Sequence, residues 1–185
     1  MGGKNPKRSV PEVFMGQRVA VFLDIQSLYY ACRDAHGDDA RLDYGPLLEW
    51  VVGERILTRA VAYLRYNREV DTHGFHQALN NKGFEVQSKP AKDHRDRPLT
   101  WTVGMFLDIF RCQEKFDLAI VLTHEEEFSD ALIHLGAVGL PVEIWGFKEQ
   151  LSSGLKQNAA KFLFIPDNCV IHRIEKRSDG SDREE

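Results

Sequence analysis

Acidic residues directly follow two apolar runs of strand length. Asp24 ends the run RVAVFLD at residues 18–24, and Glu125 and Glu127 follow the run DLAIVLT at residues 117–123. If both runs are parallel strands, their carboxyl ends share one rim of a sheet, where α/β proteins bind ligands. Clustered carboxylates there can hold Mg²⁺ or Mn²⁺, because these ions prefer oxygen ligands. Such an ion can activate water and clamp a phosphodiester for attack.

The same acids also have structural interpretations. Asp24 is placed to cap the helix that follows it. The acids at 125–127 suit a solvated helix N-terminus, where negative charge interacts favourably with the helix dipole. At this point both interpretations stay open.

Basic residues gather near the expected rim. A polar loop at 89–98 precedes a helical stretch and carries Lys89, Lys92, Arg95 and Arg97, while Arg65 lies at the end of an apolar run. These side chains can hold phosphates beside an acidic site. The alternative is an ordinary solvated loop and strand end, since Asp93 and Asp96 dilute the positive charge. Tyr29 and Tyr30 follow Asp24 closely, and we expect one of them to pack in the core.

Strand-like and helix-like segments alternate along the chain. We expect strands at 18–24, 56–66, 84–88, 117–123, 141–145 and 161–165 and helices at 27–36, 44–52, 75–82, 99–114, 127–138 and 151–159. Ser27 is a candidate N-cap for the first helix. The stretch 99–114 places Val103, Phe106, Leu107 and Phe110 on one helical face. Near-continuous apolar strands separated by helices predict a parallel sheet that is covered on both faces.

The composition is that of an ordinary globular domain. The chain has 185 residues, of which 43% are hydrophobic and 28% charged, so we expect one domain at 18–173. Residues 1–17 are expected to form a flexible arm and 174–185 a disordered tail. The net charge of −4 gives no overall positive field, so nucleic-acid binding requires a local patch.

The absence of known sequence motifs argues against several kinds of binding site and against membrane or secreted locations. The sequence lacks the GxGxxG, P-loop, GxSxG and HExxH patterns and has no zinc-type spacing of its three cysteines. The first 17 residues have no apolar stretch of signal-peptide type, and the apolar runs are of strand length. We therefore expect no membrane span, a cytoplasmic location and reduced cysteines.

The order of several segments resembles the NYN domain family, the PIN-like, LabA/DUF88-type domains. The matching segments span about residues 17–166 and run VAVFLD-IQ-SLYY, LDYGPLLEWV, AVAYLRY, KGFEVQSKP, TVGMFLDIF, FDLAIVLTHEEEFSDAL, LPVEIWGF and LSSGLKQNAAKFLFIP. The resemblance implies a three-layer α/β/α sandwich with a mostly parallel central sheet. It also implies a carboxylate-bound divalent ion and RNA as the substrate.

The resemblance assigns site residues with several departures from the family pattern. The metal-binding and catalytic acids fall on Asp24, Asp108, Glu125 and Glu127, the last two being lengthened from Asp. Where the family pattern has Asn after the first acid, this chain has Ser27, and where it has Asp at the start of the central helix, this chain has Thr102. The Ser-Gly pair that precedes the last acids in the family is Thr123-His124 here. The charge of the acidic set is kept while its geometry changes, because each Glu is one methylene longer than Asp.

Three hypotheses follow for the function. In the first, the protein is a metal-dependent ribonuclease that uses Mg²⁺ or Mn²⁺, with His124 as a further candidate ligand. In the second, it is a catalytically impaired NYN domain that binds RNA or protein. In the third, it acts as a homodimeric interaction protein.

Overall fold

The computed structural model describes residues 16–67, 71–93, 95, 97–148 and 152–172. Its centre is a six-stranded, entirely parallel sheet with the strand order β4-β3-β1-β5-β6-β7. The strands are β1 (Arg18–Asp24), β3 (Ile56–Tyr66), β4 (Glu85–Pro90), β5 (Leu118–Leu122), β6 (Val142–Gly146) and β7 (Lys161–Phe164). The direction of strand succession reverses at β1 and β5, and ligands bind at such reversal points in open α/β sheets.

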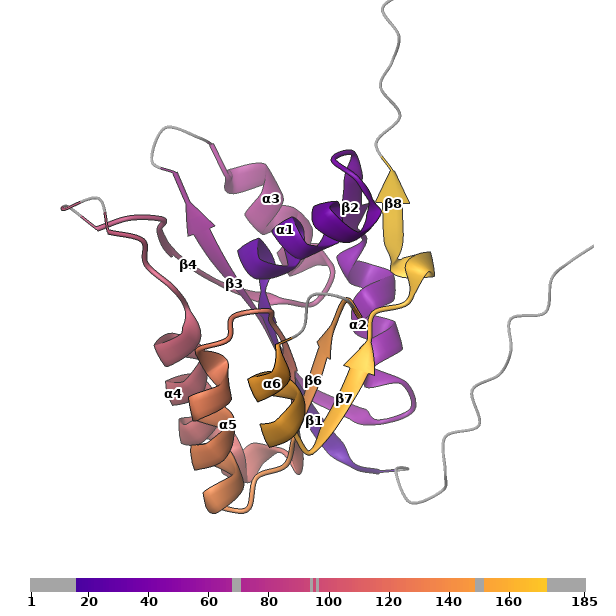
Figure 1. Cartoon of the computed structure of the whole chain (residues 1–185). Helices are drawn as coiled ribbons and strands as arrows, with labels where there is room; N and C mark the ends of the chain where they lie inside the picture. The colour runs from indigo at the N-terminus through magenta and orange to yellow at the C-terminus, as the bar shows by residue number, and fades with distance from the viewer. Residues whose placement is uncertain (1–15, 68–70, 94, 96, 149–151, 173–185) are drawn as a thin grey trace, which may run out of the picture.

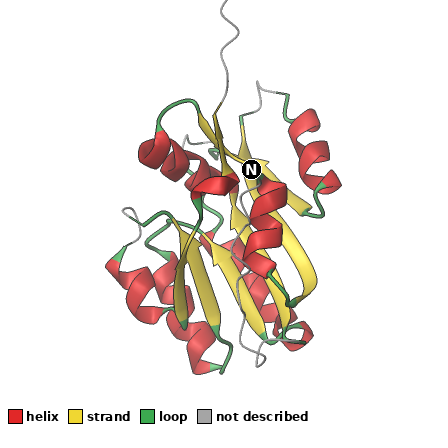
Figure 2. Ribbon diagram, turned by 90° about the vertical axis from the view of Figure 1, so that its right-hand side faces the viewer, coloured by secondary structure: helices red, strands yellow, loops and turns green. Residues whose placement is uncertain are grey.

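Helices cover both faces of this sheet (Figures 1 and 2). One layer contains α1 (Ile25–His36), α2 (Tyr44–Val52) and α3 (His73–Asn81), and the other contains α4 (Thr102–Cys112), α5 (Phe128–Ala137) and α6 (Ser153–Asn158). Alternate residues of β1 enter the two cores: Val19, Val21 and Leu23 face the first layer, and Ala20 and Phe22 face the second. The three-layer α/β/α fold expected from the sequence is therefore confirmed.

A second, small sheet joins the segment between α1 and α2 to the C-terminal end of the described chain. β2 (Ala40–Leu42) pairs antiparallel with β8 (Val170–His172), and the backbone N–H of Asp43 donates to the carbonyl of Cys169 at 2.9 Å. Neither strand is expected from the sequence, because three residues are too few to show a hydrophobic period. The pair fixes the loop between α1 and α2 against the C-terminal segment.

The six strands of the main sheet and the six helices agree with expectation to within a few residues, but two local expectations are wrong, and most of the apolar face expected at 99–114 is exposed. α1 begins at Ile25 with Asp24 as its N-cap, so Ser27 lies inside the helix. Lys89 belongs to β4 and not to a loop. Val103, Leu107 and Phe110 are exposed, because α4 packs on the sheet through Thr102, Met105 and Ile109.

Two further expectations concern segments at the edges of the structure. The proposed arm and tail lie outside the described residues, apart from Gly16 and Gln17. No helix among the residues described is long and apolar enough to cross a membrane.

Candidate functional site

Asp24 is the acid at the centre of the carboxyl rim. Its side chain is 1% exposed, and Oδ1 accepts a hydrogen bond from the backbone N–H of Ser27 at 3.1 Å. Oδ2 is buried and has no hydrogen-bond partner among the described residues. Burial raises the pKa of Asp24 from 3.8 to about 6, against the lowering effects of the Ser27 hydrogen bond and of the charge on Arg65. Within the described part of the chain, one oxygen of this buried carboxyl group is thus left without a hydrogen bond.

The turn after β5 is bound to α1 by side-chain hydrogen bonds. Ser27 Oγ accepts from the backbone N–H of His124 at 2.6 Å, and Thr123 Oγ1 accepts from that of Glu125 at 3.1 Å. The Nε2 atom of His124 accepts from the backbone N–H of Phe147 at 3.2 Å, and the two rings stack with their centroids 6.0 Å apart. Ser27, Thr123 and His124 therefore shape this turn, and the Nε2 lone pair of His124 is occupied.

Arg65 brings a positive charge to the acids at the rim. The side chain of Gln26 holds its backbone, accepting from the Arg65 N–H at 2.8 Å and donating to its carbonyl. The guanidinium Nη2 lies 3.5 Å from Oε1 of Glu125, and Nη1 lies 3.5 Å from the Leu99 carbonyl. The charges of Arg65 and Glu125 act on Asp24 in opposite directions, lowering and raising its pKa respectively. Asp24, Glu125 and Arg65 therefore form one electrostatic group.

Lys89 adds a second cation beside this group. It is the register neighbour of Arg65 on β4, its Nζ donates to the Thr100 carbonyl, and the same Nζ lies 4.1 Å from the ring centroid of Trp101. Burial and the charge of Arg65 lower the pKa of Lys89, while the charge of Asp24 raises it. The rim thus carries two positive charges, those of Arg65 and Lys89, that interact electrostatically with Asp24.

Asp108 is held by a tyrosine. The hydroxyl of Tyr63 donates to Oδ2 of Asp108 at 2.7 Å, and Tyr63 is the register neighbour of Asp24 on β3. Burial and this hydrogen bond raise the pKa of Tyr63, so its proton stays on the phenol oxygen. Thr102, at the start of α4, is 9% exposed, and its Oγ1 has no partner among the residues described.

Glu126 and Glu127 are the remaining acids of the turn after β5. A Cβ atom added to Gly154 would lie 2.7 Å from Oε1 of Glu126, which places the side chain of Glu126 against α6. Glu127 is exposed and occupies the N-cap position of α5 without making a side-chain capping bond. Its position agrees with the solvated helix N-terminus that the sequence also allows.

The basic loop before α4 folds around an aspartate. Asp93 accepts from the backbone N–H groups of Arg95 and Arg97, and its Oδ2 lies 2.6 Å from Nη2 of Arg97. Lys92 forms an isolated β-bridge with Pro98. Lys92, Arg95 and Arg97 are exposed, but the charge of Arg97 is partly neutralised by Asp93.

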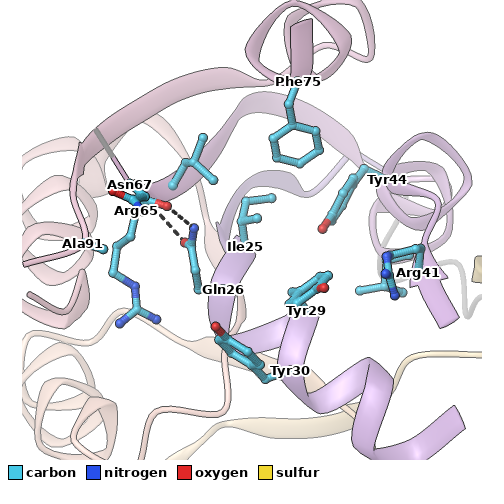
Figure 3. A pocket seen from close by; sticks show the side chains of 12 residues that line it. Ile25, Gln26, Tyr29, Tyr30, Arg41, Tyr44, Arg65, Asn67, Phe75 and Ala91 are labelled. Carbon is cyan, nitrogen blue, oxygen red and sulfur yellow. Dashed lines mark hydrogen bonds between the residues drawn. The ribbon is translucent and has the colours of Figure 1, made fainter. Parts of the chain in front are cut away.

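Two hollows open beside these groups. The first, here called the rim hollow, has a volume of about 280 Å³ and is lined by Ser27, Tyr30, Ala31, Asp34, Arg65, His124 and Glu125. The second, here called the aromatic pocket, has a volume of about 650 Å³ and lies between α1, the segment around β2 and the end of β3 (Figure 3). Arg65 and Tyr30 line both, so the two hollows adjoin.

The aromatic pocket was not foreseen from the sequence. Tyr29 and Tyr30 on α1, Tyr44 on α2 and Phe75 on α3 supply its aromatic walls, together with Arg41 on β2. The adjacent Tyr29-Tyr30 pair was a visible signal. Tyr44 and Phe75 are far from it in sequence, and only the fold of the chain brings them together.

In their present arrangement, the four acids do not come together as a ligand set for the divalent ion that the family implies. The described part of the chain contains no group of three or more His, Cys, Asp or Glu side chains that could hold a metal ion. Asp108 is bound to Tyr63, and Glu125 lies beside the Arg65 guanidinium. Arg65 and Lys89 already supply positive charge around Asp24, and they would repel a bound metal ion.

A parallel α/β/α sandwich with acids at the strand-reversal point is consistent with a PIN-like domain. The model of the NYN domain family matches residues 18–167, and the chain belongs to this family. Its structure is similar to the crystal structure of a protein of unknown function from Vibrio parahaemolyticus, with a TM-score of 0.75 and 26% sequence identity. The alignment covers 85% of this chain and 98% of that one. No curated protein matches the sequence.

Proposed function

We propose that this NYN domain binds single-stranded RNA across the carboxyl rim of its sheet, with Arg65 and Lys89 receiving phosphate groups. The observation that carries the proposal is the position of Arg65. Arg65 lines both hollows, its backbone is held by the Gln26 side chain, and its guanidinium lies near Glu125 and the Leu99 carbonyl. A fixed arginine fork at the junction of two hollows suits a phosphate that lies between two nucleotides.

The acids tune this binding surface. Asp24 and Glu125 offset the charge of Arg65, so the rim holds RNA through a few directed contacts and not through a broad positive field. The net charge of −4 agrees with this mode of binding, since only a local group of cations faces the RNA. The exposed Lys92 and Arg95 extend the same function along the loop before α4, while Arg97 contributes less because of Asp93.

A second candidate function is metal-dependent cleavage of RNA, with Asp24, Asp108, Glu125 and Glu127 as the catalytic acids and Mg²⁺ or Mn²⁺ as the cofactor. Family membership supports it, as does the buried Oδ2 of Asp24 that lacks a hydrogen-bond partner among the described residues. The arrangement of the other three acids, described above, makes it the weaker of the two proposals.

One binding experiment tests the main proposal. The affinity for a short, fluorescein-labelled single-stranded RNA is measured by fluorescence anisotropy in EDTA for the wild type, Arg65→Met and Arg59→Met. We expect roughly tenfold weaker binding for Arg65→Met, because a phosphate contact is lost. Arg59 lies on the same strand, paired with Glu85 at 2.8 Å, and is the matched control. Equal affinities of all three proteins, or no binding by the wild type, would contradict the proposal.

The same RNA tests cleavage. Incubation with Mg²⁺ or Mn²⁺ and analysis on a denaturing gel compare the wild type with Asp24→Asn. Intact RNA in all samples supports the binding function. Cleavage that disappears in Asp24→Asn establishes the ribonuclease instead. The cytoplasmic location and the homodimer stay predictions, and sedimentation of the full chain measures the second.

A further inference from the structure

We infer that the aromatic pocket binds the base of a nucleotide whose phosphate is held by Arg65. The inference rests on the proposed RNA binding and extends it, because it assigns a base-stacking site beside the phosphate site. Its volume of about 650 Å³ lies within the ordinary range for pockets that take small molecules.

The walls of the pocket have the chemistry that a nucleobase needs. Tyr30 is 60% exposed and Phe75 38% exposed, so both rings present apolar surface to an incoming group. Exposed aromatic rings stack on bases of any sequence, because every base has a π-face. The edge-to-face contact of Tyr29 with Tyr30, with centroids 5.3 Å apart, fixes the orientation of the outer ring.

The charge of the pocket favours an anionic ligand. Arg41 and Arg65 line it, and no acidic side chain does so among the lining residues that the structure describes. In a chain with more acidic than basic residues, such a surface differs clearly from the average. Arg41 is fixed by hydrogen bonds to the carbonyls of Asp38 and Ala40 and lies 5.0 Å from the centroid of the Tyr29 ring.

Polar groups at the inner wall can read the edge of a base. Figure 3 shows the hydroxyl of Tyr44 directed toward the space between Ile25 and Tyr29. Tyr44 is largely buried, and burial raises the pKa of this hydroxyl, so it acts as a hydrogen-bond donor at neutral pH. A base nitrogen or carbonyl oxygen can accept that bond.

The connection between the two hollows sets the path of the bound RNA strand. Tyr30 and Arg65 line both, and Figure 3 shows the Tyr30 hydroxyl and the Arg65 guanidinium on the same side of the pocket. A nucleotide with its base in the aromatic pocket therefore places its phosphate at Arg65. The next nucleotide of the RNA strand then lies over the rim hollow, next to Glu125.

The test compares substitutions of one exposed ring. Affinity for a short single-stranded RNA is measured in EDTA for the wild type, Tyr30→Ala, Tyr30→Phe and Phe164→Ala. Tyr30→Ala is expected to bind roughly five- to a hundredfold more weakly, because stacking on one base is lost. Tyr30→Phe keeps the ring and is expected to stay close to the wild type. Phe164, a 46% exposed aromatic on the distant edge strand β7, is the matched control.

Two further probes separate this inference from the RNA-binding proposal. A strand of the same length made of abasic ribose phosphate is expected to bind the wild type and Tyr30→Ala equally. Adenosine and uridine 5′-monophosphates, titrated by calorimetry, test the pocket without a strand. If the wild type binds RNA and Tyr30→Ala binds equally well, the pocket assignment is overturned while RNA binding stands.

The mononucleotide titration decides the case in which RNA does not bind. Mononucleotide binding that is weakened in Tyr30→Ala would then support a base pocket that serves free nucleotides. The absence of mononucleotide binding in that case would overturn the inference together with the proposed function. Circular dichroism of each variant confirms that the fold is retained.

Discussion

Asp24 and Glu143 are both buried carboxyl groups of the central sheet, but their surroundings differ. Glu143 is 3% exposed, and its Oε2 lies 2.9 Å from Nη1 of Arg55 and 3.4 Å from Nε1 of Trp145. Arg55 also donates to the carbonyls of Val51 and Val52. The carboxylate of Asp24 instead interacts with the backbone N–H groups of Ser27 and Gln26, and no ion pair with Arg65 is found among the described residues, although the charge of Arg65 lowers its pKa.

The difference separates a structural acid from a candidate functional one. Glu143 lies in register with Ile120 and, through it, with Val21 in the middle of β1, whereas Asp24 ends that strand. Ligands of parallel sheets bind beyond the carboxyl ends of the strands. An acid that is buried at that rim with one unpartnered oxygen destabilises the fold locally, and functional sites are where such arrangements are found.

The largest effect is expected when the structural pair is broken. Arg55→Met leaves the Glu143 carboxylate buried without its cation, so the free energy of unfolding should fall by about 3–5 kcal/mol. Urea denaturation measures this. Arg59→Met, which removes a more exposed partner of Glu85, should lower it by at most about 1 kcal/mol. Equal losses in both variants would show that the burial of Glu143 adds nothing to its ion pair.

Removal of the charge at Asp24 should stabilise the protein, in contrast to the loss of stability expected for Arg55→Met. The pKa of Asp24 is about 6 in the folded protein and near 3.8 in the unfolded chain, so the folded state binds its proton more tightly. This contribution to stability is complete below the unfolded pKa and is lost as the pH rises through about 6. Asp24→Asn should therefore raise the free energy of unfolding at neutral pH, by on the order of 2 kcal/mol.

The pH dependence provides the control for that prediction. Thermal unfolding of Asp24→Asn and wild type should differ at neutral pH and converge below about pH 3, where Asp24 is largely protonated in both states of the wild type. Glu143→Gln should destabilise the protein at neutral pH instead, because it weakens a direct ion pair. A destabilised Asp24→Asn at neutral pH would mean that Asp24 is a structural acid like Glu143.

The smallest change in the free energy of unfolding should come from substitution of Arg65, whose charge acts on Asp24 without a direct ion pair. Arg65→Met should lower the free energy of unfolding by about 1 kcal/mol, since its contact with Glu125 is long and partly exposed. The same change should raise the pKa of Asp24 above about 6, because the charge of Arg65 lowers it. The carboxyl carbon shift of Asp24 in an NMR titration measures this. An unchanged pKa would separate the two residues electrostatically.

The sequence predicts the framework of the fold well because the framework depends on local patterns. Continuous apolar runs such as 118–122 are typical of strands buried on both faces, and acids that follow parallel strands lie at one rim of the sheet. The NYN family membership inferred from the order of segments was confirmed on the same basis. The capping role of Asp24, weighed as an alternative, was also correct.

The site was harder to predict because it depends on side-chain direction. Helical spacing groups Val103, Leu107 and Phe110 correctly, yet it cannot tell which of two apolar faces of α4 meets the sheet. Likewise, no local pattern shows that Tyr63 binds Asp108 or that Arg65 lies beside Glu125, since each pair joins separate elements. Whether the four acids act in catalysis stays a prediction.

The β2–β8 pair has a consequence for how the protein is made. Arg41 and Leu42 of β2 line the aromatic pocket, and β2 is paired only with β8 in its sheet, at the end of the described chain. During synthesis, the strands that carry Asp24 and Arg65 leave the ribosome long before Val170 does. We therefore expect a nascent chain to complete its acidic rim first and to fix the wall of the pocket at β2 only after β8 has been synthesised.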